Sequence, residues 1–160
     1  MKTSKLLSLA VAGAFLASCG NGNNSNSNKS GAMGASDAAS RVYVAPGEYD
    51  EYYAFLSGGF SGQLATYGLP SGRLLKVIPV FSQDPEKAYG YNEETKPLLQ
   101  TTHGFIPWDD THHPDLSQTN GEVDGRWIFI NANNTPRVAR ISLKTFETEE
   151  ILELPNAAGN

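Results

Sequence analysis

A pattern of three short β-strands occurs twice in this chain, the second time 74 residues after the first. The sequence predicts strands at 52–57, 63–68 and 74–81, and again at 126–131, 137–142 and 148–154. These runs are rich in aromatic, Leu, Ile and Val residues, and joints containing Gly, Pro or Asn separate them. At this offset, without a gap, apolar residues coincide pairwise: Phe55 with Phe129, Leu56 with Ile130, Leu64 with Val138, Tyr67 with Ile141, Leu69 with Leu143, Val77 with Ile151, Ile78 with Leu152 and Val80 with Leu154.

Both copies have the same order: a strand, a polar turn, a second strand, a corner containing Leu, and a third strand. A repeat of about 40 to 50 residues with four strands is typical of a β-propeller blade. Residues 82–125 separate the copies, and only 85–99 has room for a short helical turn. We therefore predict an all-β fold made of propeller blades with an insertion between them. The alternative is that two unrelated β-meanders align by chance.

The first 19 residues, MKTSKLLSLAVAGAFLASC, are similar to the signal of a bacterial lipoprotein. Lys2 and Lys5 precede an apolar stretch at 6–17, which has the length of a secretory signal's apolar region. The end, LASC, resembles a lipobox, in which the signal is removed before the Cys and the thiol is diacylated. No Arg-Arg pair precedes the apolar run, so the general secretory route is predicted. The alternatives are an ordinary signal peptide with a chance Cys, or a buried N-terminal helix.

Residues 1–18 are thus predicted to be a signal peptide, and Cys19 to carry the lipid that anchors a periplasmic protein to a membrane. Residues 20–40 are mostly Asn, Ser and Gly, and we interpret residues 19–40 as the lipidated Cys and a flexible tether. The domain then covers residues 41–160. Four propeller blades would need roughly 160 to 200 ordered residues, so the sequence predicts a propeller that is incomplete in this chain.

Composition excludes several classes of partner and site. Lys and Arg number 12 against 17 Asp and Glu, without a basic cluster, so nucleic acid is not expected to bind. One cysteine excludes an internal disulfide framework and a Cys-rich zinc site. No apolar run reaches the roughly 18 residues of an ordinary membrane-spanning helix.

All three histidines, His103, His112 and His113, lie in the insertion between the repeats. A neutral imidazole has one nitrogen free to bind a metal. Adjacent histidines on an extended backbone point to opposite sides, so His112 and His113 cannot easily chelate one ion together, but they can bind two metals of a cluster, or two sides of one site. The carboxylates Asp109, Asp110 and Asp115 flank the pair, and a carboxylate that accepts the second ring N–H is the usual partner of a metal-binding histidine. By itself the pattern is more often a solvated loop than a set of ligands, and residues 109–116 are interpreted as a loop.

Four segments, in this order, resemble the N-terminal part of the nitrous oxide reductase family. They are residues 48–62 (EYDEYYAFLSGGFSG), 109–116 (DDTHHPDL), 124–142 (DGRWIFINANNTPRVARIS) and 154–160 (LPNAAGN). The resemblance covers essentially all of residues 41–160. It implies the N-terminal blades of a seven-bladed β-propeller, which in this family carries a four-copper sulfide cluster (CuZ) held by seven histidines. A C-terminal cupredoxin domain with a two-copper site (CuA) follows in the family and is absent from this sequence.

The same resemblance assigns the site residues. His112 and His113 match the adjacent pair of the family's HHP motif, the first two ligands of CuZ. Asp110 matches an acidic position of the motif and is a candidate to orient a ligand, whereas His103 matches no ligand and is expected to be structural. No residue beyond the metal ligands is assigned a catalytic role.

The resemblance also implies the activity, the two-electron reduction of nitrous oxide to dinitrogen and water in denitrification. Electrons would come from a c-type cytochrome or a quinol-linked chain, and the complete enzyme would be a homodimer with CuA copper and calcium. The lipoprotein signal indicates the branch of this family that is exported by the general secretory route. Because most CuZ ligands are missing, these 160 residues alone are expected to be inactive. The alternative function is a non-enzymatic, lipid-anchored β-repeat lipoprotein that binds a ligand or partner.

Overall fold

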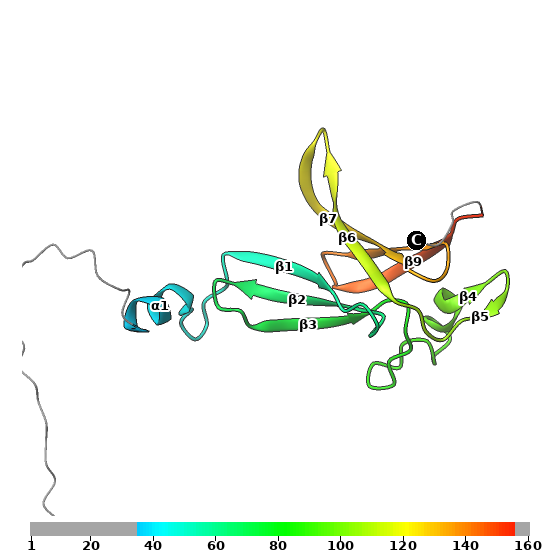
Figure 1. The fold of residues 1–160 in the computed structure, drawn as a ribbon, viewed down its shortest axis with the longest axis horizontal. Helices are drawn as coiled ribbons and strands as arrows, with labels where there is room; N and C mark the ends of the chain where they lie inside the picture. The colour runs from blue at the N-terminus through cyan, green and yellow to red at the C-terminus, as the bar shows by residue number, and fades with distance from the viewer. Residues whose placement is uncertain (1–34, 156–160) are drawn as a thin grey trace, which may run out of the picture. The chain divides into compact units, whose positions relative to one another are not determined.

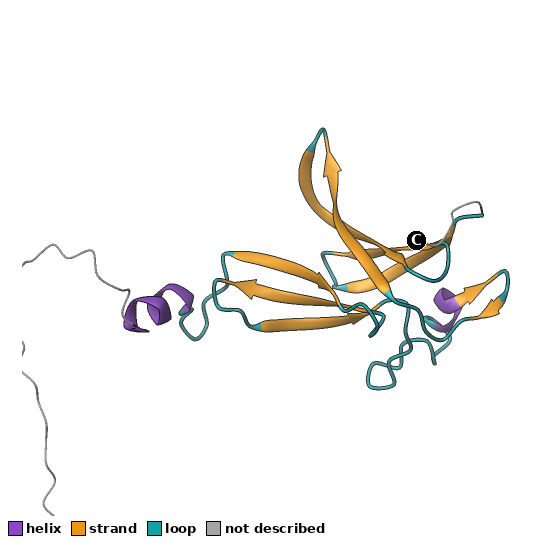
Figure 2. Cartoon of the chain, in the orientation of Figure 1, coloured by secondary structure: helices purple, strands orange, loops and turns teal. Residues whose placement is uncertain are grey.

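The computed structural model describes residues 35–155, whose regular secondary structure is mostly antiparallel β-strand (Figure 1). The predicted signal peptide, Cys19 and most of the predicted tether lie outside these residues. The strands are β1 (Tyr52–Ser57), β2 (Gln63–Leu69), β3 (Leu74–Pro79), β4 (Gln100–Thr101), β5 (Gly104–Phe105), β6 (Thr111–Thr119), β7 (Glu122–Ala132), β8 (Arg137–Ser142) and β9 (Glu147–Glu153). Helix is confined to α1 (Ala35–Val42) and the short 3-10 helix η1 (Lys96–Leu99), drawn purple in Figure 2. The prediction of an all-β fold is confirmed.

The strands form one sheet for each copy of the repeat. The first is three-stranded with the order β1-β2-β3, and the second is four-stranded with the order β6-β7-β8-β9. All neighbouring strands are antiparallel and consecutive in the chain, so each sheet is a simple meander. Each predicted strand of both copies is present. A four-stranded meander has the form of a propeller blade, so the structure is compatible with the predicted architecture.

Strand β6 was not expected, because residues 109–116 were interpreted as a loop. Pro and Asp are unfavourable in strands, and the register between β6 and β7 shifts between His112 and Asp115. The strand forms because β7 is long enough, at 11 residues, to pair with β6 along one edge and β8 along the other.

The hydrophobic core joins the two sheets. On β7, buried Ile128 and Ile130 alternate with more exposed neighbours, as the two-residue period of a strand requires. They cluster with buried apolar residues of the first sheet and the segment after it, of the end of β7 and of β8: Leu64, Ile78, Val80, Phe81, Ala132, Ala139 and Ile141. The hydroxyl of Thr148 on β9 also donates a hydrogen bond to the carbonyl of Pro79 on β3, at 2.8 Å. The apolar pairs that define the sequence repeat therefore include residues of one shared core.

The insertion between the sheets contains η1 within the region where a short helical turn was predicted. Its Leu99 is buried, and the buried Tyr89 hydroxyl donates a hydrogen bond to the carbonyl of Val80 at 2.7 Å. Helix α1, in contrast, spans Ala35–Val42 and so includes residues 35–40, which were interpreted as part of the flexible tether. Three of its eight residues are Ala, which has the highest helix propensity. None of the helices within residues 35–155 is long and apolar enough to cross a membrane.

We expect stability to decrease in acid, because five carboxyl groups have pKa values below their ordinary range: Asp50, Asp84, Asp109, Asp124 and Glu153. Burial raises the pKa of the first three, but hydrogen bonds and nearby positive charges outweigh it. For Asp124 the largest cause is the hydrogen bond from Arg126, and for Glu153 it is the hydrogen bond from the Thr102 amide.

A carboxyl with a lowered pKa stabilises the fold above its unfolded-state pKa of about 4, and this contribution is lost as the pH falls through the folded-state pKa. The urea concentration at the unfolding midpoint should therefore fall steadily between about pH 5 and about pH 3. A midpoint that stays constant or rises over this range would contradict the assignment.

Candidate metal centre

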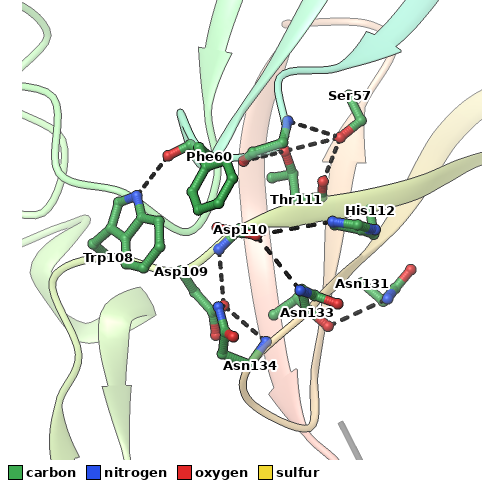
Figure 3. A network of polar contacts seen from close by, with 12 residues as sticks. Ser57, Phe60, Trp108, Asp109, Asp110, Thr111, His112, Asn131, Asn133 and Asn134 are labelled. Atoms are coloured by element: carbon green, nitrogen blue, oxygen red, sulfur yellow. Dashed lines mark hydrogen bonds and ion pairs between the residues drawn. The ribbon is translucent and has the colours of Figure 1, made fainter. Parts of the chain in front are cut away.

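The candidate centre lies where β6 begins, and hydrogen bonds hold this point to the turn between β1 and β2 (Figure 3). The amide of Thr111 donates to the carbonyl of Gly59 at 3.0 Å, and its hydroxyl donates to the carbonyl of Gln63 at 2.9 Å. The Ser57 hydroxyl donates to the carbonyl of Thr111. Thr111 is fully buried, so the residue immediately before the histidine pair is fixed against the first sheet.

His112 pairs with Asn131 in β6, but the backbone is not extended at His113, and the expectation that their rings point to opposite sides is wrong. His113 has a φ of +49°, in the left-handed region, and a β-bulge interrupts the pairing between His112 and Asp115. A bulge redirects side chains that would otherwise alternate between faces. The ring centroids are 5.6 Å apart with an interplanar angle of 71°. This separation is too short for rings on opposite faces of a strand, so both imidazoles are available to one metal centre.

Asp110 lies beside His112, as the sequence predicts for a group that orients a ligand. Its Oδ2 is 3.9 Å from Nε2 of His112 and 3.5 Å from Nδ2 of Asn133 (Figure 3). The amide of Asn133 donates to the carbonyl of Asp110 at 3.2 Å. Asp110 is only 5% exposed, and its Oδ1 is buried without a hydrogen-bond partner. One carboxylate oxygen therefore faces a histidine, while the other keeps an unused acceptor in the interior.

The sequence analysis named Asp109 only as one of three carboxylates that flank the pair, yet it has the densest polar contacts near the pair. It is 1% exposed and accepts hydrogen bonds from Asn134, Thr135 and Arg137, all in or next to the β7–β8 turn. Burial opposes its ionisation, but these donors hold the pKa of the carboxyl below its ordinary value. The sequence indicated this polar cluster only by two adjacent aspartates, Asp109 and Asp110. It does not show which residues, some 25 positions later, donate hydrogen bonds to Asp109.

His103 lies apart from this arrangement. It occupies the exposed turn between β4 and β5, where its amide donates to the Thr101 hydroxyl at 3.1 Å. The neighbouring Thr102 donates through its amide and hydroxyl to the carboxylate of Glu153 on β9. Among residues 35–155, no recorded contact joins His103 to His112 or His113. The interpretation of His103 as a residue outside the ligand set stays a prediction.

The donors present fit part of a copper site. Imidazole suits copper, as it does zinc, iron and nickel, and the unpartnered Oδ1 of Asp110 shows that the polar interior beside the two rings is not saturated. Within residues 35–155, no group of three or more His, Cys, Asp or Glu side chains is arranged to hold a metal ion. The histidine pair therefore fits two ligands of a larger set, not a closed site of its own.

Comparison with known proteins identifies relatives of one kind. No established family profile matches the chain. The chain is 41% identical over 148 residues to the nitrous-oxide reductase of Pseudomonas fluorescens, and 36% identical over 147 residues to that of Stutzerimonas stutzeri. Each match covers 92% of this chain and 23% of the relative. The nitrous-oxide reductase of Cupriavidus necator is 40% identical over 134 residues, or 81% of this chain and 21% of the relative. The chain thus spans less than a quarter of the length of these relatives.

Proposed function

Since this chain belongs to the nitrous-oxide reductase family, we propose that it is part of an oxidoreductase that reduces nitrous oxide at a copper centre. The observation that supports this proposal is the geometry at the start of β6. Two imidazoles lie 5.6 Å apart beside a buried carboxylate with an unused acceptor, in a chain 41% identical to a nitrous-oxide reductase. The overall reaction consumes two electrons and two protons and gives dinitrogen and water.

In this proposal His112 and His113 hold copper, and the other ligands of the four-copper sulfide cluster CuZ belong to parts of the protein outside residues 35–155. When bound, the copper centre supplies the electrons and a Lewis-acidic surface for nitrous oxide. The residues of this chain hold the ligands in place. The Asp110 carboxylate, with Oδ2 3.9 Å from Nε2 of His112, would orient this imidazole, as carboxylates beside metal-binding histidines do. Thr111, which lies between Asp110 and His112, anchors the start of β6 to the first sheet. In this proposal, residues 1–160 alone do not turn over nitrous oxide.

The complete enzyme is proposed to work in anaerobic respiration, as seven propeller blades followed by a cupredoxin domain. Electrons enter through CuA from a c-type cytochrome or a quinol-linked chain. We also propose that the complete enzyme is a homodimer and binds calcium. These assignments come from the family resemblance, and they predict that activity needs a reduced donor as well as loaded copper.

The experiment that tests the function is anaerobic purification of the protein as its gene encodes it, with copper supplied during expression. We expect copper to copurify and nitrous oxide to be consumed when a reduced donor is added. A copper-free product without turnover would overturn the proposal. It would favour the second candidate, a non-enzymatic lipid-anchored binding lipoprotein. The specific observation in favour of that candidate is that residues 35–155 contain no complete metal-binding group.

We also propose that Cys19 is lipidated and anchors the protein on the periplasmic side of a membrane. Cys19 is the sole cysteine of this chain, so Cys19→Ala should abolish incorporation of a labelled fatty acid into the protein completely. Wild-type protein should fractionate with membranes, because two or three acyl chains contribute roughly 0.8 kcal/mol per buried CH₂ group. Wild-type protein that is unlabelled and wholly soluble would contradict the anchor.

A further inference from the structure

We infer that Asp109 is a positioning residue for the proposed metal centre. It does not contact either histidine in the recorded interactions. It holds the β7–β8 turn against the segment that contains Asp110 and leads into β6, the strand of His112. The inference rests on the proposed function, because it gives Asp109 a role in preparing His112 for a metal. From the sequence Asp109 was only one of three flanking carboxylates, without a role of its own.

The Asp109 carboxylate is buried and its acceptors are fully used. Its Oδ1 accepts from the amide of Asp110 at 2.8 Å and from the amide and side-chain nitrogen of Asn134 at 3.0 and 2.8 Å. Its Oδ2 accepts from the Thr135 hydroxyl at 2.5 Å and from Nη2 of Arg137 at 3.3 Å. The residue is 1% exposed. The donors come from both the strand leading into β6 and the turn between β7 and β8, so this one group joins the two segments.

The connection to His112 passes through Asn133, the residue before the anchored part of the turn. Its amide donates to the carbonyl of Asp110 at 3.2 Å, and its side-chain nitrogen is 3.5 Å from Oδ2 of Asp110. That same Oδ2 faces Nε2 of His112 at 3.9 Å. Figure 3 shows Asp109, Asp110, Asn133 and Asn134 around the start of the strand, with His112 directly beyond Asp110. If the turn is released, Asp110 loses its contacts with Asn133.

Stability alone is a weak explanation for this group. A buried ion pair is often no more stabilising than apolar residues of similar volume, because two charges must be desolvated. The Asp109–Arg137 pair is buried on both sides, with each side chain 1% exposed. Arg137 also keeps a buried Nη1 without a hydrogen-bond partner. The contacts instead converge on the turn that touches Asp110, as a positioning role requires.

The chain offers a matched control in Asp50. Its side chain is also 1% exposed, and it also clamps a turn, accepting hydrogen bonds from Ser71 and Arg73 between β2 and β3. It makes no recorded contact with the histidine pair or with Asp110 within residues 35–155. Replacing either aspartate by Asn removes a carboxylate that accepts hydrogen bonds from a turn. Only the replacement of Asp109 should affect the metal centre.

The test compares Asp109→Asn with Asp50→Asn in the copper-loaded protein as its gene encodes it. The readouts are the thermal midpoint, the visible absorption spectrum of the bound copper, and copper release to a chelator at a temperature where all variants are folded. Both variants should have lower midpoints. Asp109→Asn alone should change the spectrum and weaken copper binding by about tenfold or more, the range for groups that support metal ligands. The Asp50→Asn spectrum should match that of the wild type.

The outcomes separate this inference from the proposed function. If wild-type protein binds copper but the spectrum and copper release of Asp109→Asn match those of Asp50→Asn, the positioning role is overturned and the function stands. If wild-type protein binds no copper, the proposed function fails and the inference fails with it. If Asp109→Asn does not fold, Thr135→Val, which removes one hydrogen bond from the carboxylate, takes its place. An unchanged spectrum in that folded variant would likewise overturn the inference.

Discussion

Replacement of His112 or His113 by Ala should lower the copper content and the nitrous oxide turnover of the protein together. Each substitution removes one imidazole from a pair whose rings lie 5.6 Å apart, and within residues 35–155 no third His, Cys, Asp or Glu side chain is grouped with the pair to replace it. Loss of a group that supports a ligand costs roughly 10- to 100-fold in metal affinity or activity. Loss of a ligand itself should cost at least the upper end of that range, about 100-fold in turnover.

The matched control for this prediction is His103→Ala. It removes the third histidine of the chain from an exposed turn between β4 and β5, so copper content and turnover should stay at the wild-type level. Copper per protein chain, measured by mass spectrometry on anaerobically purified samples, and turnover with a reduced donor give the two readouts. Unchanged copper and activity in the His112 and His113 variants would remove the site assignment. An equal loss in His103→Ala would show that the assay reports general damage.

Most of the fold could be predicted because the apolar pattern repeats. The paired positions at an offset of 74 residues include core members such as Leu64, Ile78 and Ile141, and their burial fixes the register of both sheets. Strand β6 could not be predicted, since Pro114 and Asp115 are poor strand formers and the strand exists through pairing with β7. Its edge position and bulge accommodate the residues that locally oppose it.

The candidate residues of the site could be named from the sequence, but their geometry could not, and their role as ligands stays a prediction. The adjacent His112 and His113 are visible in the sequence, whereas the left-handed backbone at His113 depends on the bulge opposite β7. The role of Asp109 depends on contacts with the β7–β8 turn, 25 to 28 positions later in the chain. Local sequence patterns carry no information on such pairings, because the sheet register determines them.

The glycine at position 62 gives the largest expected effect on stability. Gly62 has a φ of +65°, and a Cβ there would lie 2.6 Å from the carbonyl oxygen of Asp109 and 2.7 Å from Cβ of Ser82. Its own carbonyl accepts hydrogen bonds from the amides of Val80 and Phe81 at 3.1 and 2.9 Å. Gly62→Ala therefore combines about 1–2 kcal/mol for the left-handed backbone with about 1–3 kcal/mol for overpacking. We expect a loss of about 2–5 kcal/mol in the free energy of unfolding, measured by urea titration.

Gly59 separates the two contributions, because it lies in the same turn with a φ of +54° and has open space where a Cβ would be. Gly59→Ala should cost only the backbone contribution, about 1–2 kcal/mol. The difference between the variants measures how closely the β1–β2 turn packs on the backbone of Asp109. If Gly62→Ala and Gly59→Ala lose the same free energy of unfolding, the segment leading into β6 moves away from the added methyl group without cost. A rigid segment is what the positioning of Asp110 and His112 requires, so Gly62→Ala should also weaken copper binding, whereas Gly59→Ala should not.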